Sequence, residues 1–336
     1  MNHEHSILPI ATGEAACAAQ ALYGLRGTAQ VLASERDQTM RLATADGAVF
    51  VLKISHPEAP AEAAGFQLGA LRHLAAHAPA LPVPRVVPTY AGAAFARYVY
   101  ADGSRRLTSL LTWLPGETLH AASPGAAQAA ALGGFMARLA LGLRTYPAPA
   151  REETQLWDIT HALGISPLLD QAEPALQALV RPVLEEFAAA TLPGLNVLPR
   201  QVIHNDCNPH NVLVDAQDPA RIAGLIDFGD LVCAPRVNDL AIALSYRIPH
   251  EAARATIPDL LHGYEAVTPL APPERALLPG LIRARMAMTV TISAWRARMA
   301  PENAVYLLRY HHGARACLEA LHGQPPARVQ AMLCPG

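Results

Sequence analysis

The stretch Val202-Ile-His-Asn-Asp-Cys-Asn-Pro-His-Asn-Val-Leu-Val-Asp215 sets polar residues between two short apolar runs, and Ile226-Asp-Phe-Gly-Asp230 ends a third. Residues Val212–Val214 and Ala223–Ile226 have the length and apolar character of two strands joined by a loop. Such strands run antiparallel, so the start of the first lies beside the end of the second. We therefore expect a hairpin that brings polar residues from both stretches together.

Three polar side chains meet at this hairpin. Asn211 precedes the first strand and Asp227 follows the second, so an amide oxygen and a carboxylate face one gap. Mg²⁺ takes hard oxygen ligands of this kind and shares them with phosphates. Asp206, in the loop just before, can orient a hydroxyl group and accept its proton during phosphoryl transfer, and His204 is expected to brace this catalytic loop. These residue types also crowd ordinary turns, but their joint spacing favours the functional interpretation.

The rest of the chain divides at Pro115-Gly116. Before this point, turns at Asp46-Gly47 and Asp102-Gly103 between apolar runs predict two hairpins. Residues 11–22 and 62–77 predict helices, and after residue 116 helical spacing dominates. We expect an α+β protein. Its N-terminal lobe, residues 1–115, is expected to contain an antiparallel sheet. The larger, mainly helical C-terminal lobe, residues 116–336, carries the catalytic loop and the metal-binding hairpin.

The order His204-Asn205-Asp206, Asn211 and Asp227-Phe228-Gly229 resembles the catalytic loop and metal motif of the kinase-like phosphotransferases. This group contains aminoglycoside phosphotransferases, choline kinases and hydroxylysine kinases. The hydroxylysine kinase branch resembles this chain most. The resemblance extends over most of the chain, and the stretches that carry it are residues 23–27, 34–38, 50–54, 110–116, 288–296 and 301–303. The resemblance implies a protein-kinase-like two-lobed fold and transfer of a nucleotide phosphate to an alcohol. It also implies that Asp206 is catalytic and that Asn211 and Asp227 bind the metal.

Lys53 lies on an apolar strand of the N-terminal lobe, residues 1–115, the lobe that the resemblance implies is nucleotide-binding. Strand alternation puts Lys53 on one face with Val49 and Val51, where it needs a partner or reaches water. The kinase resemblance implies that this partner is a nucleotide phosphate, with Mg²⁺ and ATP or GTP as cofactors. It further implies that Ser34 covers the phosphates and that Gln67 assists Lys53, with Glu62 as the other candidate. The backbone around Thr112 and Leu114 is implied to face the base.

The acceptor is expected to be a small molecule. Asp227 is followed almost at once by the helix that begins near Asp239, which leaves no room for the activation segment that docks a peptide in protein kinases. Asp239 itself is expected to cap that helix or to brace the catalytic loop. Carboxylates and aromatic faces suit an amine, which makes Asp230, Trp295 and Tyr306 substrate candidates. Trp157 and Asp158 are further candidates of this kind. An amino-acid acceptor would also need a cation for its carboxylate, for which Arg285 and Arg296 are candidates.

The acceptor that we expect is a hydroxylated amine or hydroxy amino acid similar to hydroxylysine. Aminoglycosides, homoserine and choline or ethanolamine are the alternatives within the same enzyme class. A nucleotide-binding regulatory module with weak turnover is the alternative outside it, because Gln67 stands where the resemblance implies a glutamate.

Composition excludes several other classes. The 336 residues include 26 Lys and Arg against 28 Asp and Glu, for a net charge of −2, so neither a nucleic-acid surface nor a polybasic membrane anchor is expected. Five scattered cysteines form no CxxC pair, which argues against a disulfide framework or a thiolate zinc site. The start of the chain lacks signal-peptide features, and Gln128 and Arg138 interrupt the apolar residues 126–143. We expect a cytoplasmic protein and leave its oligomeric state open.

Overall fold

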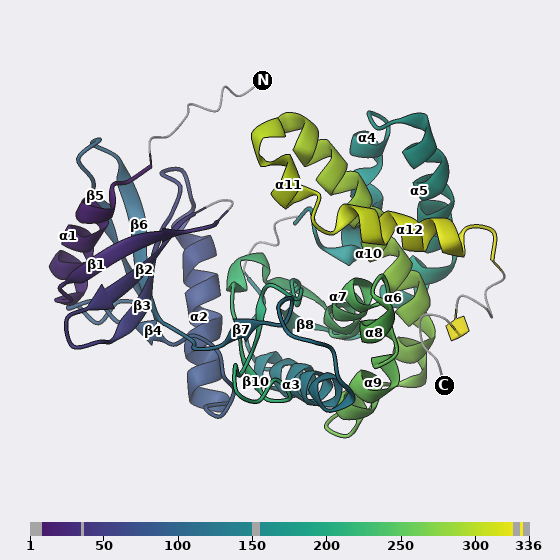
Figure 1. Cartoon of the computed structure of the whole chain (residues 1–336), viewed down its shortest axis with the longest axis horizontal. Coiled ribbons are helices and arrows are strands. Elements are labelled where there is room, and N and C mark those ends of the chain that lie inside the picture. The colour runs from purple at the N-terminus through teal and green to yellow at the C-terminus, as the bar shows by residue number, and fades with distance from the viewer. Residues whose placement is uncertain (1–8, 35–36, 150–154, 325–329, 332–336) are drawn as a thin grey trace. The chain divides into compact units, whose positions relative to one another are not determined.

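The computed structural model describes residues 9–34, 37–149, 155–324 and 330–331 (Figure 1). The chain forms two compact units, Met1–Pro115 and Gly116–Gly336. Antiparallel sheet dominates the first unit and helix the second, which confirms the α+β class predicted from the sequence. No disulfide links the four cysteines in the described ranges.

The first unit is built on an antiparallel sheet. Its elements are α1 (Thr12–Tyr23), β1 (Gly27–Leu32), β2 (Gln38–Thr44), β3 (Val49–Ile54), α2 (Ala61–His77), β4 (Val86–Val87), β5 (Phe95–Val99) and β6 (Arg105–Thr112). In the described part of the unit the strand order is β1-β2-β3-β6-β4, and β5 also pairs with β6. Both predicted hairpins are present, since β2 pairs with β3 and β5 with β6.

One face of this sheet forms a core with α1. The small residues Ala15, Ala18 and Ala19 of the helix are fully buried in the same cluster as Leu52 and Ile54 of β3. Because side chains alternate along a strand, Lys53 points to the other face with Val49 and Val51. All three are half-buried there. The alternation predicted for β3 is therefore confirmed.

The second unit contains two small antiparallel sheets. Its strands are β7 (Glu117–Thr118), β8 (Arg200–Ile203), β9 (Val212–Val214), β10 (Ile222–Leu225) and β11 (Val232–Pro235). One sheet has the order β10-β9-β7, and the other pairs β11 with β8. Gly116, just before β7, has φ 136°, and a Cβ there would stand 2.6 Å from the carbonyl oxygen of Val214. A glycine is thus required where the chain enters this sheet.

Helices make up most of the second unit. They are α3 (Ala126–Leu143), η1 (Ile159–Ile165), α4 (Ser166–Leu169), α5 (Pro174–Glu186), η2 (Phe187–Thr191), α6 (Leu192–Leu195), η3 (Phe228–Asp230), α7 (Val237–Arg247), α8 (Glu251–Arg254), α9 (Ile257–Glu265), α10 (Pro272–Met299), η4 (Pro301–Asn303), α11 (Ala304–Leu307) and α12 (His311–Leu321). Helices α4 and α5 are separate, because α4 ends at Leu169 and Pro174 opens α5 at a position where its missing N–H costs nothing.

Helix α3 is a central packing element. Two glycines let its backbone touch that of α9: a Cβ at Gly133 would overlap the carbonyl oxygen of Leu260, and one at Gly263 would overlap that of Ala130. Gln128 and Arg138 do not interrupt the helix. By length and composition alone it could cross a membrane, but 61% of its apolar window is buried inside the fold. The helix is accounted for here by its packing against α9.

Candidate active site

The pairing of β9 with β10 brings Asn211 and Asp227 to the same end of one hairpin. The two strands are antiparallel, with Val212 opposite Leu225, as the sequence predicts. The ladder extends one step further, because the Ile226 N–H donates to the carbonyl oxygen of Asn211 at 2.9 Å. Asp227 is the next residue, and its side chain is exposed.

Asp227 is held in an uncommon backbone conformation. Its φ is 61°, in the left-handed region that few residues other than glycine adopt. The turn of η3 begins immediately after it, and a Cβ on Gly229 would stand 3.1 Å from the Asp227 Oδ1 atom. The Asp-Phe-Gly sequence therefore has a local reason: the glycine leaves space for the carboxylate that precedes it.

Both carboxylate oxygens of Asp206 have partners. Oδ2 accepts hydrogen bonds from the side-chain amides of Asn208, at 2.8 Å, and Asn211, at 2.6 Å. Oδ1 lies 3.5 Å from the Arg285 guanidinium. The Asn211 amide nitrogen also donates to the backbone carbonyl of Asp206, so the nitrogen faces the catalytic loop and Oδ1 is the atom directed elsewhere. Asp206 and Asn211 thus form one hydrogen-bonded unit.

Burial gives Asp206 the character of a proton acceptor. Desolvation raises the pKa of Asp206 to about 7, and the nearby carboxylates of Asp230 and Asp227 raise it further, while Arg285 opposes them. A carboxylate with a pKa near neutrality is well matched to general-base chemistry at physiological pH. The same cluster places Asp230 within electrostatic range of Asp206.

The catalytic loop is anchored from α7. The Asp239 carboxylate accepts hydrogen bonds from the backbone N–H groups of His204, at 3.0 Å, and Asn205, at 2.6 Å. Of the two roles predicted for Asp239, the structure therefore shows the brace and not the helix cap. Burial raises the pKa of Asp239 to about 6, against these two hydrogen bonds.

His204 is completely buried and braces the loop. Its Nδ1 accepts from the Asp206 N–H, its Nε2 contacts the Ile226 carbonyl at 3.2 Å, and its ring meets Phe228 edge-on. Burial lowers the pKa of His204 to about 4, so the ring is neutral at physiological pH. Asn205 next to it has φ 65°, a region that asparagine tolerates better than most residues.

Arg285 of α10 is the residue whose role the sequence did not reveal. Its side chain is 1% exposed, and it donates to the Trp157 carbonyl oxygen at 2.7 Å and to the Tyr246 hydroxyl at 3.3 Å. The guanidinium also lies 4.8 Å from the centre of the Trp157 ring. The sequence marks it only as a candidate for binding a substrate carboxylate. Instead it is the buried counter-ion of Asp206, and the apolar positions around it in α10 were the only available signal.

Asn211 and Asp227 fit a divalent cation that is shared with phosphate. The donor set is one amide oxygen and one exposed carboxylate, both hard oxygen ligands. Within the described ranges, no group of three or more His, Cys, Asp and Glu side chains could hold a metal ion alone. Two protein ligands supplemented by phosphate oxygens and water are the pattern that Mg²⁺ adopts in phosphoryl-transfer sites.

The residues expected to bind the nucleotide belong to the first unit. Lys53 lies on β3 and Gln67 on α2, both half-buried. The Ser34 hydroxyl accepts from the Thr39 N–H at 3.3 Å, whereas Glu35 and Arg36 of the same turn lie outside the described residues.

The segment after β6 is held by backbone hydrogen bonds. The N–H of Thr112 donates to the Arg85 carbonyl and its hydroxyl accepts from the Arg85 N–H, while the part predicted for this segment in binding a base stays a prediction. The N–H of Trp113 donates to Val49. For the backbone N–H of Leu114, the next residue, no hydrogen bond is found among the described residues.

The candidate substrate residues do not all gather at Asp206. Asp230 does, as its electrostatic effect on Asp206 and Arg285 shows. Trp295 instead lines a separate hollow of about 250 Å³ with Arg298 and Arg315. Tyr306, on α11, is covered by Arg309, whose guanidinium lies 3.7 Å from the ring centre.

The other candidates have structural roles or no assigned place. Asp158 is 3% exposed and caps η1 by accepting from the Thr160 N–H at 2.9 Å. Trp157 packs against Arg285. Arg296 is half-buried on α10.

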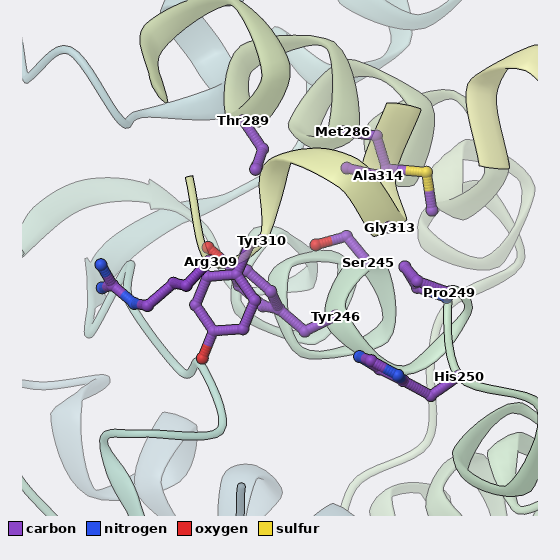
Figure 2. A pocket seen from close by; sticks show the side chains of 10 residues that line it. All are labelled: Ser245, Tyr246, Pro249, His250, Met286, Thr289, Arg309, Tyr310, Gly313 and Ala314. Carbon is purple, nitrogen blue, oxygen red and sulfur yellow. The ribbon is translucent and has the colours of Figure 1, made fainter. Parts of the chain in front are cut away.

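A hydrogen-bonded chain leads from the catalytic loop toward the C-terminal helices. The Tyr310 hydroxyl bonds His210 Nδ1 and lies 3.5 Å from Asn208 Oδ1. On the other side, the Tyr310 ring packs on Tyr246 at 4.5 Å between ring centres. Both tyrosines line a small cavity of about 50 Å³ (Figure 2). Residues late in the chain therefore help to support the loop that carries Asp206.

The second unit brings together a base (Asp206), a pair suited to a cation (Asn211 and Asp227) and the guanidinium of Arg285. Asp206 can take a proton from a hydroxyl group, and Asn211 and Asp227 can hold a cation that neutralises phosphate charge. Such positioning and charge neutralisation are what phosphoryl transfer asks of a protein.

Comparison with known sequences gives the same chemistry. Residues 28–278 match the phosphotransferase enzyme family. Hydroxylysine kinase from Danio rerio is 27% identical over 304 residues, which cover 85% of this chain and 84% of the relative. Homoserine kinase from Acidiphilium cryptum (strain JF-5) is 34% identical over 235 residues, which cover 64% of each chain.

Comparison with solved structures gives the same fold. Amicoumacin kinase hAmiN, solved in complex with AMP-PNP, Ca²⁺ and Ami, superposes with a TM-score of 0.68. The match covers 90% of this chain and 92% of that chain at 16% identity. The protein-kinase-like fold expected from the sequence is confirmed.

Proposed function

Since this chain belongs to the phosphotransferase enzyme family, we propose that it is a kinase whose acceptor is the hydroxyl group of a small hydroxy amino acid similar to hydroxylysine. The observation that carries this proposal is the Asp206 cluster. The half-buried carboxylate of Asp206 is hydrogen-bonded to Asn211, and the exposed carboxylate of Asp227 follows the β9–β10 hairpin at the same end.

Asp206 is the base that positions the acceptor. Its carboxylate accepts a hydrogen bond from the acceptor hydroxyl, whose oxygen then forms a bond to the γ-phosphorus of the nucleotide. The bond from that phosphorus to the β–γ bridging oxygen breaks, its electron pair leaves with the nucleoside diphosphate, and the hydroxyl proton passes to Asp206. Arg285 holds the Asp206 carboxylate at Oδ1, while Asn208 and Asn211 hold it at Oδ2.

The donor is ATP or GTP with Mg²⁺. Asn211 and Asp227 would hold the cation, which neutralises phosphate charge when it is bound. In the first unit, Lys53 binds phosphate, Ser34 and Gln67 assist it, and the Leu114 backbone faces the base. The solved relative that carries a nucleotide analogue and Ca²⁺ supports a nucleotide donor and a divalent cation.

The protein is expected to work in a reducing cytoplasm, where its cysteines stay as thiols.

The amino-acid acceptor is supported by the relatives and by the charges in the site. Hydroxylysine and homoserine kinases are among the sequences that this chain resembles. Asp230, half-buried beside Asp206, is suited to the ammonium group of such an acceptor.

Replacing Asp206 by Asn tests the proposal. Turnover is measured with ATP and GTP against a panel of 5-hydroxylysine, homoserine, ethanolamine, choline and aminoglycosides. D206N should lower kcat by at least ~10²-fold, the scale of a positioned acid–base group, while nucleotide binding persists. D218N is the matched control, because Asp218 is an exposed carboxylate of the same unit that only caps a loop. Near-normal turnover of D206N, or no transfer to any acceptor by the wild type, would contradict the proposal.

A further inference from the structure

The aromatic patch near the C-terminus carries a positive charge. Tyr306 offers a ring that could receive a substrate ammonium group, but the Arg309 guanidinium already lies over it, 3.7 Å from the ring centre. The same guanidinium lies 5.2 Å from the centre of the Tyr310 ring. An arginine stacked on tyrosines repels an amine and attracts an anion.

Arg309 has donors to spare for such an anion. Its side chain is exposed, and Nη1 donates to the Tyr306 carbonyl oxygen at 2.8 Å. Among the residues that the structure describes, no carboxylate forms an ion pair with it. A guanidinium has five N–H donors in a fixed planar arrangement that matches a carboxylate. The stacking on two rings holds that plane in place before any ligand arrives.

The position of Arg309 connects it with the catalytic loop. The next residue, Tyr310, bonds His210 through its hydroxyl and approaches Asn208, whose amide donates to Asp206 at 2.8 Å. The Arg309 charge also contributes, after burial and His120, to the lowered pKa of His210, the residue before Asn211. In Figure 2 the Arg309 side chain points away from Pro249 and His250, which lie on the other side of the tyrosine rings.

We propose that Arg309 binds the carboxylate of the amino-acid acceptor and thereby selects hydroxy amino acids over amino alcohols of the same length. This inference rests on the proposed kinase function. Arg285 does not serve this purpose, because it is 1% exposed and is engaged by Asp206, Trp157 and Tyr246. The acceptor is then recognised at three points: its hydroxyl by Asp206, its ammonium by Asp230 and its carboxylate by Arg309.

Substrate pairs that differ only by a carboxylate test this assignment. Homoserine is compared with 3-aminopropan-1-ol, and 5-hydroxylysine with its decarboxylated analogue. The wild type should prefer the carboxylated member of each pair. In R309M, kcat/KM for that member should fall about 10- to 100-fold through KM, the range for a lost charged hydrogen bond. The decarboxylated member should be unaffected, and R309K should retain part of the preference.

Two arginines serve as controls. Arg315 is paired with Glu173 and Glu319, and Arg296 is the other cation that the sequence offered. R315M and R296M should both keep the wild-type preference. A loss of preference in R296M, or an equal effect of R309M on both members of a pair, overturns the role of Arg309 while the kinase function stands. So does a wild type that phosphorylates only the amino alcohols. A wild type that transfers phosphate to no member overturns both proposals.

Discussion

At the scale of single residues, one buried charge decides the state of Asp206. Burial and two neighbouring carboxylates favour its neutral form, and they are opposed chiefly by Arg285 and also by the hydrogen bond from Asn208. A buried charge whose partner is removed is left uncompensated, which costs more than the pair contributes in net stability. Arg285 thus acts on the reaction through Asp206.

Replacing Arg285 by Met should therefore impair turnover more than binding. We expect kcat to fall about 10-fold or more, since a misplaced or neutral base loses much of the contribution of general-base catalysis, with little change in the KM for the nucleotide. Steady-state kinetics in both substrates measure this split. R285K should recover only part of the rate, because lysine lacks the planar donors that reach Trp157 and Tyr246.

Arg283 provides the control for that experiment. It lies on the same helix but pairs with Glu186, away from Asp206. R283M should keep the wild-type kcat. Equal losses of kcat in R283M and R285M would show that α10 is merely disturbed.

The sequence predicts residues that lie close together in the chain better than those that lie far apart. Asp206, Asn211 and Asp227 were placed together correctly because one hairpin joins them. For Asp239 the sequence left two roles open, a helix cap or a brace, and the structure shows the brace. The role of Arg285 was not predicted, because its partnership with Asp206 depends on how α10 packs, and neither spacing nor periodicity reveals that.

At the scale of elements, the contact between α3 and α9 depends on two glycines. A side chain at Gly263 would collide with the backbone of α3 at Ala130, and backbone atoms cannot rotate out of the way. The helices would have to separate, which exposes or loosens the buried residues around them.

Gly263→Val should therefore destabilise the second unit by about 1–3 kcal/mol or more, the range for overpacked cores. The measurement is urea-induced unfolding followed by circular dichroism. Gly164→Val is the matched control, because no other atom lies within 4 Å of a Cβ at that position. If both substitutions lower the free energy of unfolding equally, Gly263 is not needed for the close approach of α3 and α9.

Among elements, hairpins with a clear turn were predictable and the β8–β11 pair was not. Asp46-Gly47 and Asp102-Gly103 mark their turns directly, and β2–β3 and β5–β6 form as expected. β8 and β11 have four residues each, and the catalytic loop, β9 and β10 separate them. Their pairing is a tertiary event without a local signal.

At the scale of the whole molecule, buried titratable groups couple stability to pH. His204 is neutral in the fold, with its pKa lowered from 6.5 to about 4 by burial. Above pH 6.5 the ring is neutral in both folded and unfolded states and contributes no pH dependence. Below pH 6.5, His204 is protonated in the unfolded chain but not in the folded chain, so the free energy of unfolding decreases as pH falls toward 4.

This loss can be isolated by comparing the wild type with His204→Gln. Asp206 and Asp239 have raised pKa values and act in the opposite sense, but they are common to both proteins. The stability advantage of the wild type should shrink by about 3 kcal/mol between pH 7 and pH 4. Chemical unfolding at several pH values measures it. A constant difference across that range would mean that His204 is not buried in its neutral form.

The order of the parts along the chain has an evolutionary consequence. Asp206, Asn211 and Asp227 lie within one short middle segment, whereas Arg309 and Tyr310 lie near the end, between α11 and α12. Mutations in the exposed turn between α11 and α12 can thus change the acceptor during evolution, while the middle segment that transfers the phosphate stays unchanged.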